Sequence, residues 1–261
     1  MEVGISTACL YPELVEVALF ELARRNVNLV EIFINTNCEL EKNFVLDMKR
    51  ITDEYDVKVA SLHPYTCGIE PMMFFTKYER RFLDILDYYK RYFEVMNILG
   101  AEIFVFHGNK DQNPFPDEEY FERFAGLAKV GKEFGITVSQ ENVARCTSGR
   151  LTFLKEMSAY LGDTAKFVLD TKQVLRAGED TFEFLAELKG KITHIHFSDS
   201  GDNGDCLLYG EGNFDCNRFF KTLKQDGFTG NIMMELYRGG YKDCDSLAEN
   251  YQKLKRAVSQ I

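Results

Sequence analysis

Eight short segments rich in β-branched or aromatic residues alternate along this chain with longer segments of helical periodicity. A strand followed by a returning helix is the repeating unit of α/β proteins with a parallel sheet. Eight such units in 261 residues occupy about 33 residues each, which matches the size and order of a (β/α)8 TIM barrel. We therefore predict an α/β fold, a single TIM-barrel domain over residues 1–261. The predicted strands are Val3–Thr7, Leu29–Phe33, Val57–His63, Glu102–His107, Thr137–Asn142, Phe167–Thr171, Ile192–Phe197 and Asn231–Leu236.

Several of the intervening segments also show where a helix begins or ends. The apolar stripe from Phe82 to Met96 has helical spacing and is followed by Gly100, a residue suited to the left-handed conformation after a helix. Asp215 is a candidate N-cap of a helix that ends before Gly227. Further helices are predicted at Pro12–Arg25, Glu41–Tyr55, Asp117–Phe134, Leu151–Leu161, Thr181–Leu188 and Leu247–Val258.

A doubly wound open sheet is the main alternative fold for such an alternation. The first strand-to-helix turn, STACLYPE, lacks the GxGxxG pattern that cradles a pyrophosphate, and the chain has no GxxxxGK[ST] pattern. The sequence therefore lacks the patterns that would predict nucleotide binding at such a sheet.

Charge and cysteine content restrict the partners and the compartment. The chain has 31 basic and 41 acidic residues, a net charge of −10, which disfavours binding to nucleic acid or to an anionic membrane. Its seven cysteines are an odd number and form no CxxC pair, so we expect reduced thiols in a cytoplasmic protein. No uncharged apolar run approaches the ~18 residues that span a bilayer.

Polar side chains recur where the predicted strands end. All four histidines lie in or at the end of a strand, and acidic residues hold comparable places on other strands. A single strand-end carboxylate is more often a loop ion pair or a helix N-cap. An ordered series of them favours one pocket, because the carboxyl ends of barrel strands converge. The residues are His63, His107, His194 and His196, with Glu31, Glu141, Asp170 and Glu235.

Four of these residues form a plausible set of metal ligands. Carboxylates in the interior of a barrel are costly unless they are paired or bind a metal. Glu141, Asp170, His196 and Glu235 could meet one divalent cation, and three oxygen ligands with one imidazole suit Mn²⁺, Mg²⁺, Co²⁺ or Zn²⁺. His194 shares a strand face with His196, so we expect it to support that ligand or to be a hydrogen-bonded core histidine.

The ordered motifs HPY, FHG, QENV, LDTK, HIHFSDS, GEGNFD and MELY resemble the xylose-isomerase-like TIM-barrel superfamily of sugar and sugar-phosphate isomerases and epimerases. The resemblance covers essentially the whole chain. It implies one divalent metal held by Glu141, Asp170, His196 and Glu235, and a small sugar or keto-polyol as substrate. It also implies that Glu141 and Glu235 are catalytic and move a proton on the carbon beside the substrate carbonyl. His63 and His107 would then face substrate hydroxyls.

Some positions depart from the family or have open roles. The family usually carries a histidine three residues after the strand-6 aspartate, where this chain has Gln173, which can still hydrogen-bond a hydroxyl. Lys172, if the strand extends that far, shares the face of Asp170 and could hold an anionic substrate group, as could Arg238.

Two acidic residues have two interpretations each. Asp199 could orient His196 or be a turn residue. Glu31 could bind substrate or bridge loops, and we favour the bridge.

Four alternative functions stay open. A keto-inositol dehydratase uses the same proton abstraction, and a barrel aldolase could form a Schiff base on Lys172. An endonuclease IV-like enzyme is disfavoured because its extra metal-binding histidines do not occur here. A barrel that binds a sugar without converting it is the fourth. The sequence leaves the oligomeric state open, a homo-oligomer included.

Overall fold

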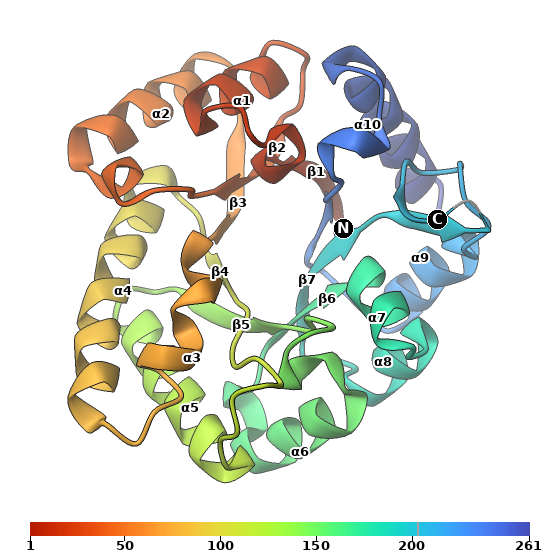
Figure 1. The fold of residues 1–261 in the computed structure, drawn as a ribbon. Coiled ribbons are helices and arrows are strands. Elements are labelled where there is room, and N and C mark those ends of the chain that lie inside the picture. Colours follow the sequence, from red (N-terminus) through yellow and green to blue (C-terminus); the bar gives the residue numbers. More distant parts are fainter. Residues whose placement is uncertain (203) are drawn as a thin grey trace.

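Eight strands, each paired in parallel with its neighbours, form a closed barrel in the computed structural model, which describes residues 1–202 and 204–261 (Figure 1). The strand order around the barrel is β1, β2, β3, β4, β5, β6, β7 and β10. The predicted (β/α)8 fold is confirmed. The strands are β1 (Glu2–Ser6), β2 (Leu29–Phe33), β3 (Lys58–His63), β4 (Ile103–Phe106), β5 (Thr137–Glu141), β6 (Phe167–Asp170), β7 (Ile192–Phe197) and β10 (Asn231–Met234), with a separate hairpin of β8 (Asp199–Gly201) and β9 (Gly204–Leu207).

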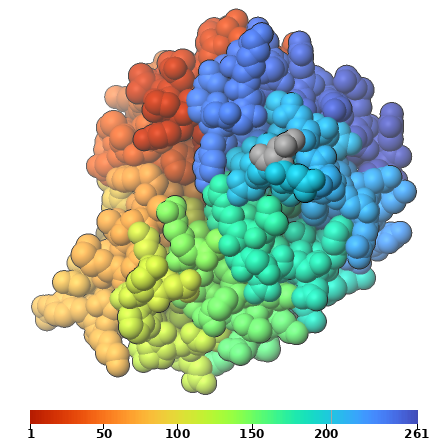
Figure 2. Space-filling model, turned by 45° about the vertical axis from the view of Figure 1, so that its right-hand side comes forward, coloured from red at the N-terminus to blue at the C-terminus, as the bar shows by residue number. Residues whose placement is uncertain are grey.

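Helices surround this barrel (Figure 1). β1 pairs with β10 and α1 contacts α10, so the two ends of the chain lie side by side (Figure 2). Within the described residues, no helix is both long and apolar enough to span a membrane. The α-helices are α1 (Val15–Ala23), α2 (Lys42–Glu54), α3 (Glu70–Met73), α4 (Glu79–Leu99), α5 (Asp117–Glu133), α6 (Leu151–Leu161), α7 (Thr171–Ala177), α8 (Thr181–Glu187), α9 (Cys216–Gln225) and α10 (Cys244–Ser259). The 3-10 helices are η1 (Thr7–Leu10), η2 (Asn37–Leu40), η3 (Tyr65–Gly68), η4 (Thr147–Gly149), η5 (Gly162–Thr164) and η6 (Arg238–Gly240).

Two of the helix boundaries confirm the sequence signals. Gly100 follows α4 with φ of 79° in the left-handed region, and its N–H bonds the carbonyl of Met96. Asp215 caps α9 by accepting a hydrogen bond from the N–H of Arg218.

The sixth strand is shorter than predicted. It ends at Asp170, whose side chain accepts a hydrogen bond from the N–H of Gln173 and so caps α7. Lys172 therefore lies in the first turn of a helix and not on a strand face. The sequence prediction missed α3 and the β8–β9 hairpin because segments of three or four residues do not show a reliable hydrophobic period, and it missed α7 because that helix begins directly after β6.

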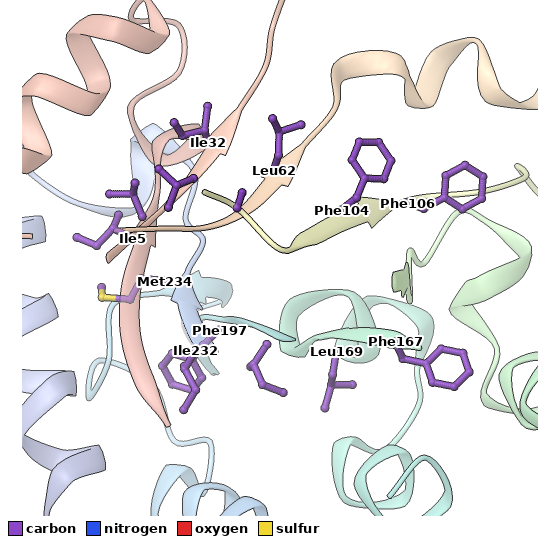
Figure 3. Close-up of a cluster of buried hydrophobic side chains, with 14 of the residues drawn as sticks. Ile5, Ile32, Leu62, Phe104, Phe106, Phe167, Leu169, Phe197, Ile232 and Met234 are labelled. Atoms are coloured by element: carbon purple, nitrogen blue, oxygen red, sulfur yellow. The ribbon is translucent and has the colours of Figure 1, made fainter. Parts of the chain in front are cut away.

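Apolar side chains on the outer face of the strands form the main core between barrel and helices. They are buried and point away from the barrel axis (Figure 3). Burying each one contributes about 1.5–3 kcal/mol. A small second cluster of Leu29, Ala60 and Met233 lies apart from it. Because strand side chains alternate, Leu29 and Met233 share their strand faces with Glu31 and Glu235, so the barrel interior changes from apolar to charged toward the strand ends. The labelled outer residues are Ile5, Ile32, Leu62, Phe104, Phe106, Phe167, Leu169, Phe197, Ile232 and Met234.

A buried carboxyl group fastens α3 to the end of β4. Glu70 Oε2 accepts a hydrogen bond of 2.8 Å from the N–H of Gly108, and its Oε1 accepts one of 2.9 Å from the hydroxyl of Tyr89. Gly108 has φ of 88°, and a Cβ there would lie 1.9 Å from Tyr120 Oη, so only glycine fits. Burial raises the pKa of Glu70 to about 7, although the two hydrogen bonds act to lower it.

The titration of Glu70 makes folding stability depend on pH. As pH rises from about 4.5 to about 7, the unfolded chain loses this proton before the folded chain, so the contribution of Glu70 to the free energy of unfolding falls by about 3 kcal/mol and is then constant. Glu70→Gln has no proton to lose, so its free energy of unfolding, measured by urea titration at each pH, should lack this contribution and fall about 3 kcal/mol less than that of wild type. Glu94→Gln, at an exposed position of α4, is the control and should keep it. Parallel pH profiles for wild type and Glu70→Gln would contradict the assignment.

Candidate active site

Seven charged or ionisable residues converge at the carboxyl ends of the barrel strands. Three of them, His63, Glu141 and Asp170, are the last residues of their strands, and His107 and Glu235 directly follow theirs. Glu31 and His196 lie within one or two residues of a strand end and are buried. Glu141, Asp170, His196 and Glu235 each offer a ligand atom, and these four atoms lie within 4.8 Å of one another. The structure thus brings together the four residues that the sequence predicted as metal ligands.

His196 is the centre of this cluster. Its Nδ1 lies 3.0 Å from Glu141 Oε1 and 3.7 Å from Glu235 Oε2, and its Nε2 lies 3.0 Å from Glu31 Oε2. Burial acts to lower the pKa of His196, but the surrounding carboxylates raise it well above its ordinary value. The Nε2–Glu31 bond fixes the orientation of the ring so that Nδ1 faces the two catalytic candidates.

Glu31 is not a loop bridge, and that prediction was wrong. Its side chain is fully buried, accepts a hydrogen bond of 2.7 Å from Ser61 Oγ and lies 3.3 Å from His194 Nε2. His194 also bonds Ser61, so it supports His196 indirectly, through Glu31. Burial acts to raise the pKa of Glu31, but His196 and His194 lower it, which keeps the carboxylate ionised. The signal was present in the sequence, since a carboxylate inside the apolar strand LVEIF is costly unless it is paired.

Asp170 is oriented by hydrogen bonds on both its backbone and its side chain. Asn142 accepts a 2.7 Å bond from the Asp170 N–H and donates a 3.1 Å bond to its carbonyl, which ties the end of β6 to the loop after β5. Asp170 Oδ1 accepts from the N–H of Gln173, whereas the buried Oδ2 makes no hydrogen bond within the described residues. Oδ2 is therefore available as a ligand atom. Sequence reasoning missed the role of Asn142, because a backbone clamp leaves no periodic pattern.

His63 and His107 approach Glu141 from another side. Their Nε2 atoms lie 3.8 Å and 3.4 Å from Glu141 Oε2, and the two rings are in edge-to-face contact with centroids 4.5 Å apart. Burial lowers the pKa of His107 to about 4, so this imidazole is neutral at physiological pH. A neutral imidazole can donate or accept a hydrogen bond, as a substrate hydroxyl requires.

An open cavity of about 610 Å³ gives access to the cluster on the Glu235 side. Its wall includes Phe33, which lies against the His63 ring at a centroid distance of 4.7 Å. The exposed side chains of Tyr11, Leu14 and Tyr237 also line it. An apolar cavity with a few converging polar groups is typical of small-molecule sites.

Comparison with known proteins agrees with this geometry. Residues 20–257 match a family model described as xylose isomerase-like TIM barrel. The chain belongs to the xylose isomerase-like TIM barrel family. An uncharacterised protein of Methanocaldococcus jannaschii is 22% identical over 254 residues, which cover 90% of this chain and 83% of that protein.

Solved structures share the fold over the whole chain. A D-tagatose 3-epimerase-like protein superposes with a TM-score of 0.81 and 18% identity, covering 100% of this chain and 98% of the other. The IolI protein, solved with a bound zinc atom, gives a TM-score of 0.80 and 19% identity, covering 100% and 99%. At these identities the likeness shows the fold alone.

The cluster residues of this family member fit a divalent cation. Asp170 Oδ2 is a buried oxygen without a hydrogen bond in the described structure, and His196 Nδ1 faces the carboxylates of Glu141 and Glu235 at 3.0 Å and 3.7 Å. A cation among these atoms would satisfy both and would relieve the repulsion among the carboxylates. The donor set of three carboxylates and one imidazole suits Mn²⁺, Mg²⁺, Co²⁺ or Zn²⁺.

Lys172 lies against two of the four candidate metal ligands. Its ammonium lies 2.9 Å from Glu235 Oε2 and 3.3 Å from Asp170 Oδ2, and the residue is 3% exposed. Burial acts to lower the pKa of Lys172, but Asp170 and Glu235 raise it well above its ordinary value, so the amine is charged. The predicted proximity to Asp170 holds, although the reason given for it, a shared strand face, was wrong.

Two other predicted substrate-binding residues make hydrogen bonds with backbone groups. Gln173 Oε1 accepts a hydrogen bond from the N–H of Ala144 and braces the loop after β5. Arg238 is exposed, and its guanidinium donates to the carbonyl of Tyr241 in its own loop. Substrate binding by Gln173 and Arg238 stays a prediction.

Asp199 is a turn residue and does not orient His196. Its Oδ1 accepts from the N–H of Ser200 and its Oδ2 from that of Gly210, so it holds the β8–β9 hairpin and the turn that follows it.

The contact between Glu31 and His196 predicts an effect on metal affinity. Glu31→Gln keeps the shape but removes the charge that polarises the imidazole, so we expect the Kd for Mn²⁺, measured by isothermal titration calorimetry, to rise about tenfold. Glu70→Gln is the matched control, because Glu70 is equally buried but does not contact His196. Equal Kd values for Glu31→Gln and wild type would show that Glu31 does not tune the ligand.

Proposed function

We propose that this protein is a divalent-metal-dependent isomerase or epimerase that acts on a small sugar or keto-polyol by moving the proton beside its carbonyl. The observation that carries the proposal is the pair Glu141 and Glu235. These carboxylates come from different strands and converge on one atom, His196 Nδ1, at 3.0 Å and 3.7 Å. Two carboxylates on either side of one substrate carbon could remove a proton from one face and return it to the other.

The proton step needs an ionised base and a stabilised enediolate. Burial acts to raise the pKa of Glu141 and of Glu235, but the neighbouring cations lower both, so each is a carboxylate able to accept a proton. A divalent cation held by Glu141, Asp170, His196 and Glu235 would supply Lewis-acid polarisation of the carbonyl. His63 and His107, next to Glu141, would orient substrate hydroxyls. Glu31 keeps His196 in place while the proton moves.

The environment of Lys172 disfavours a Schiff-base aldolase, whereas a keto-inositol dehydratase must be distinguished by its products. A Schiff-base aldolase needs a neutral Lys172, whereas Asp170 and Glu235 raise the pKa of that amine. A keto-inositol dehydratase would use the same base and the same enediolate, and differs only in expelling a β-hydroxyl. A screen of ketoses and inososes in D₂O separates these outcomes. An epimerase or isomerase exchanges the α-hydrogen and keeps the β-hydroxyl, and a dehydratase releases water. A barrel that only binds sugars gives no exchange with any of them.

The two glutamates should be indispensable for proton exchange. Glu141→Gln and Glu235→Gln each replace a base by an amide of the same shape, so solvent deuterium uptake should fall by at least about 100-fold. Asp199→Asn, which alters the hairpin next to the site, is the control and should lose much less. Full exchange in either glutamine variant would contradict the catalytic assignment.

Activity should also depend on a divalent ion. Dialysis against a chelator should abolish deuterium uptake, and Mn²⁺ or another divalent ion should restore it, because the carbonyl would otherwise lack its electrophile. Metal analysis of the same preparation should give one ion per chain. Undiminished exchange in a preparation that contains less than about a hundredth of an equivalent of metal would exclude metal dependence.

A further inference from the structure

Lys172 places a permanent positive charge against two of the four candidate ligands. It follows Asp170 by two residues. Asp170 is the N-cap of α7, so Lys172 lies in the first turn of that helix, next to the end of β6. From there its Nζ reaches Glu235 Oε2 at 2.9 Å and Asp170 Oδ2 at 3.3 Å. The Tyr237 ring lies 5.0 Å from the ammonium. The side chain is 4% exposed, so it is a fixed part of the pocket and not a surface lysine.

The charge balance of the pocket gives a physical reason for this lysine. Glu31, Glu141 and Asp170 are buried at the ends of the strands and the Glu235 side chain is 13% exposed, and such carboxylates are strongly destabilising without nearby positive charge. His196 lies between Glu31 and Glu141. Lys172 lies between the other two carboxylates. Asp170 and Glu235 therefore have a positive charge of the chain itself between them.

A divalent ion at the four-residue site would need the oxygens that Lys172 holds. Asp170 Oδ1 is already engaged by the N–H of Gln173, so Oδ2 is the oxygen left for a metal, and it is also the Asp170 oxygen that lies 3.3 Å from the ammonium. Glu235 Oε2 likewise faces both His196 Nδ1 and Lys172. Two cations that share these oxygens repel each other in a site with little water to screen them.

We propose that Lys172 is an internal counter-ion that competes with the divalent metal for Asp170 and Glu235. The inference rests on the metal site of the proposed function and adds that this chain holds its metal more loosely than the same four ligands would without the lysine. It also follows that Asp170 and Glu235 stay paired with Lys172, and that the protein stays folded, when the metal is removed. If the carboxylates are free of the ammonium in about a tenth of the molecules or fewer, the apparent Kd for the metal rises about tenfold or more.

The test compares Mn²⁺ binding by wild type with that by Lys172→Met, a neutral side chain of similar length. Titration of Mn²⁺ alone, followed by electron paramagnetic resonance of the free ion, should give a Kd at least about tenfold lower for Lys172→Met. In the presence of a chelator, Lys172→Met should melt about 5 °C or more below wild type, because its carboxylates have lost their partner. Saturating Mn²⁺ should remove most of that difference. None of these readouts needs a substrate.

Two further variants isolate the cause. Lys155→Met makes the same substitution in a surface ion pair, since Lys155 lies 3.0 Å from Glu187. It should change neither the Kd for Mn²⁺ nor the melting temperature. Lys172→Arg keeps the charge and should bind Mn²⁺ about as weakly as wild type. If Lys172→Met is recovered only with Mn²⁺ bound, back-titration with a chelator gives its Kd.

The outcomes separate the inference from the proposed function. An unchanged or higher Kd in Lys172→Met, or an equally low Kd in Lys172→Arg, would overturn the counter-ion role while leaving the metal-dependent enzyme intact. Failure of both wild type and Lys172→Met to bind Mn²⁺ at millimolar concentration would overturn the metal site itself.

Discussion

The constraint on which this structure depends is the gathering of four carboxylates, three of them buried and the fourth 13% exposed, at one end of a barrel. Their charge would not be tolerated in that interior without compensation. Two side chains of the chain itself lie against them: the imidazole of His196 between Glu31 and Glu141, and the ammonium of Lys172 between Asp170 and Glu235. The hydrogen bond that Ser61 donates to Glu31 and the one that Asn142 accepts from the Asp170 N–H then fix the orientation of this network. A pocket ordered in this way is a suitable place for a divalent ion and for proton transfer.

The barrel places this network without contributing to its chemistry. Its stability comes from apolar side chains between strands and helices, which are separate from the polar strand ends (Figure 3). Charged residues can therefore gather inside because the main core lies elsewhere. The same separation explains how one fold supports proteins with different reactions, since the side chains at the strand ends can change while the packing of the outer core is kept.

Most of the fold and half of the network were predictable from the sequence, for different reasons. The strands were found because β-branched runs and helical stripes are local patterns. Glu141, Asp170, His196 and Glu235 were found because their position along each strand is enough to place them at one end of a barrel. The role of Glu31 was predicted wrongly, because it depends on a contact with His196, which is 165 residues away in the sequence.

The sequence by itself determined the closed eight-strand barrel and the identity of the polar residues at its strand ends, since both follow from the order of residues within each segment. Only the tertiary structure decided which atoms face each other. It showed that Glu31 holds Nε2 of His196, that Asp199 belongs to a hairpin, and that Lys172 lies against Glu235, 63 residues along the chain. These contacts join separate strands and loops, and hydrogen bonds of about 3 Å depend on side-chain directions that no local pattern encodes.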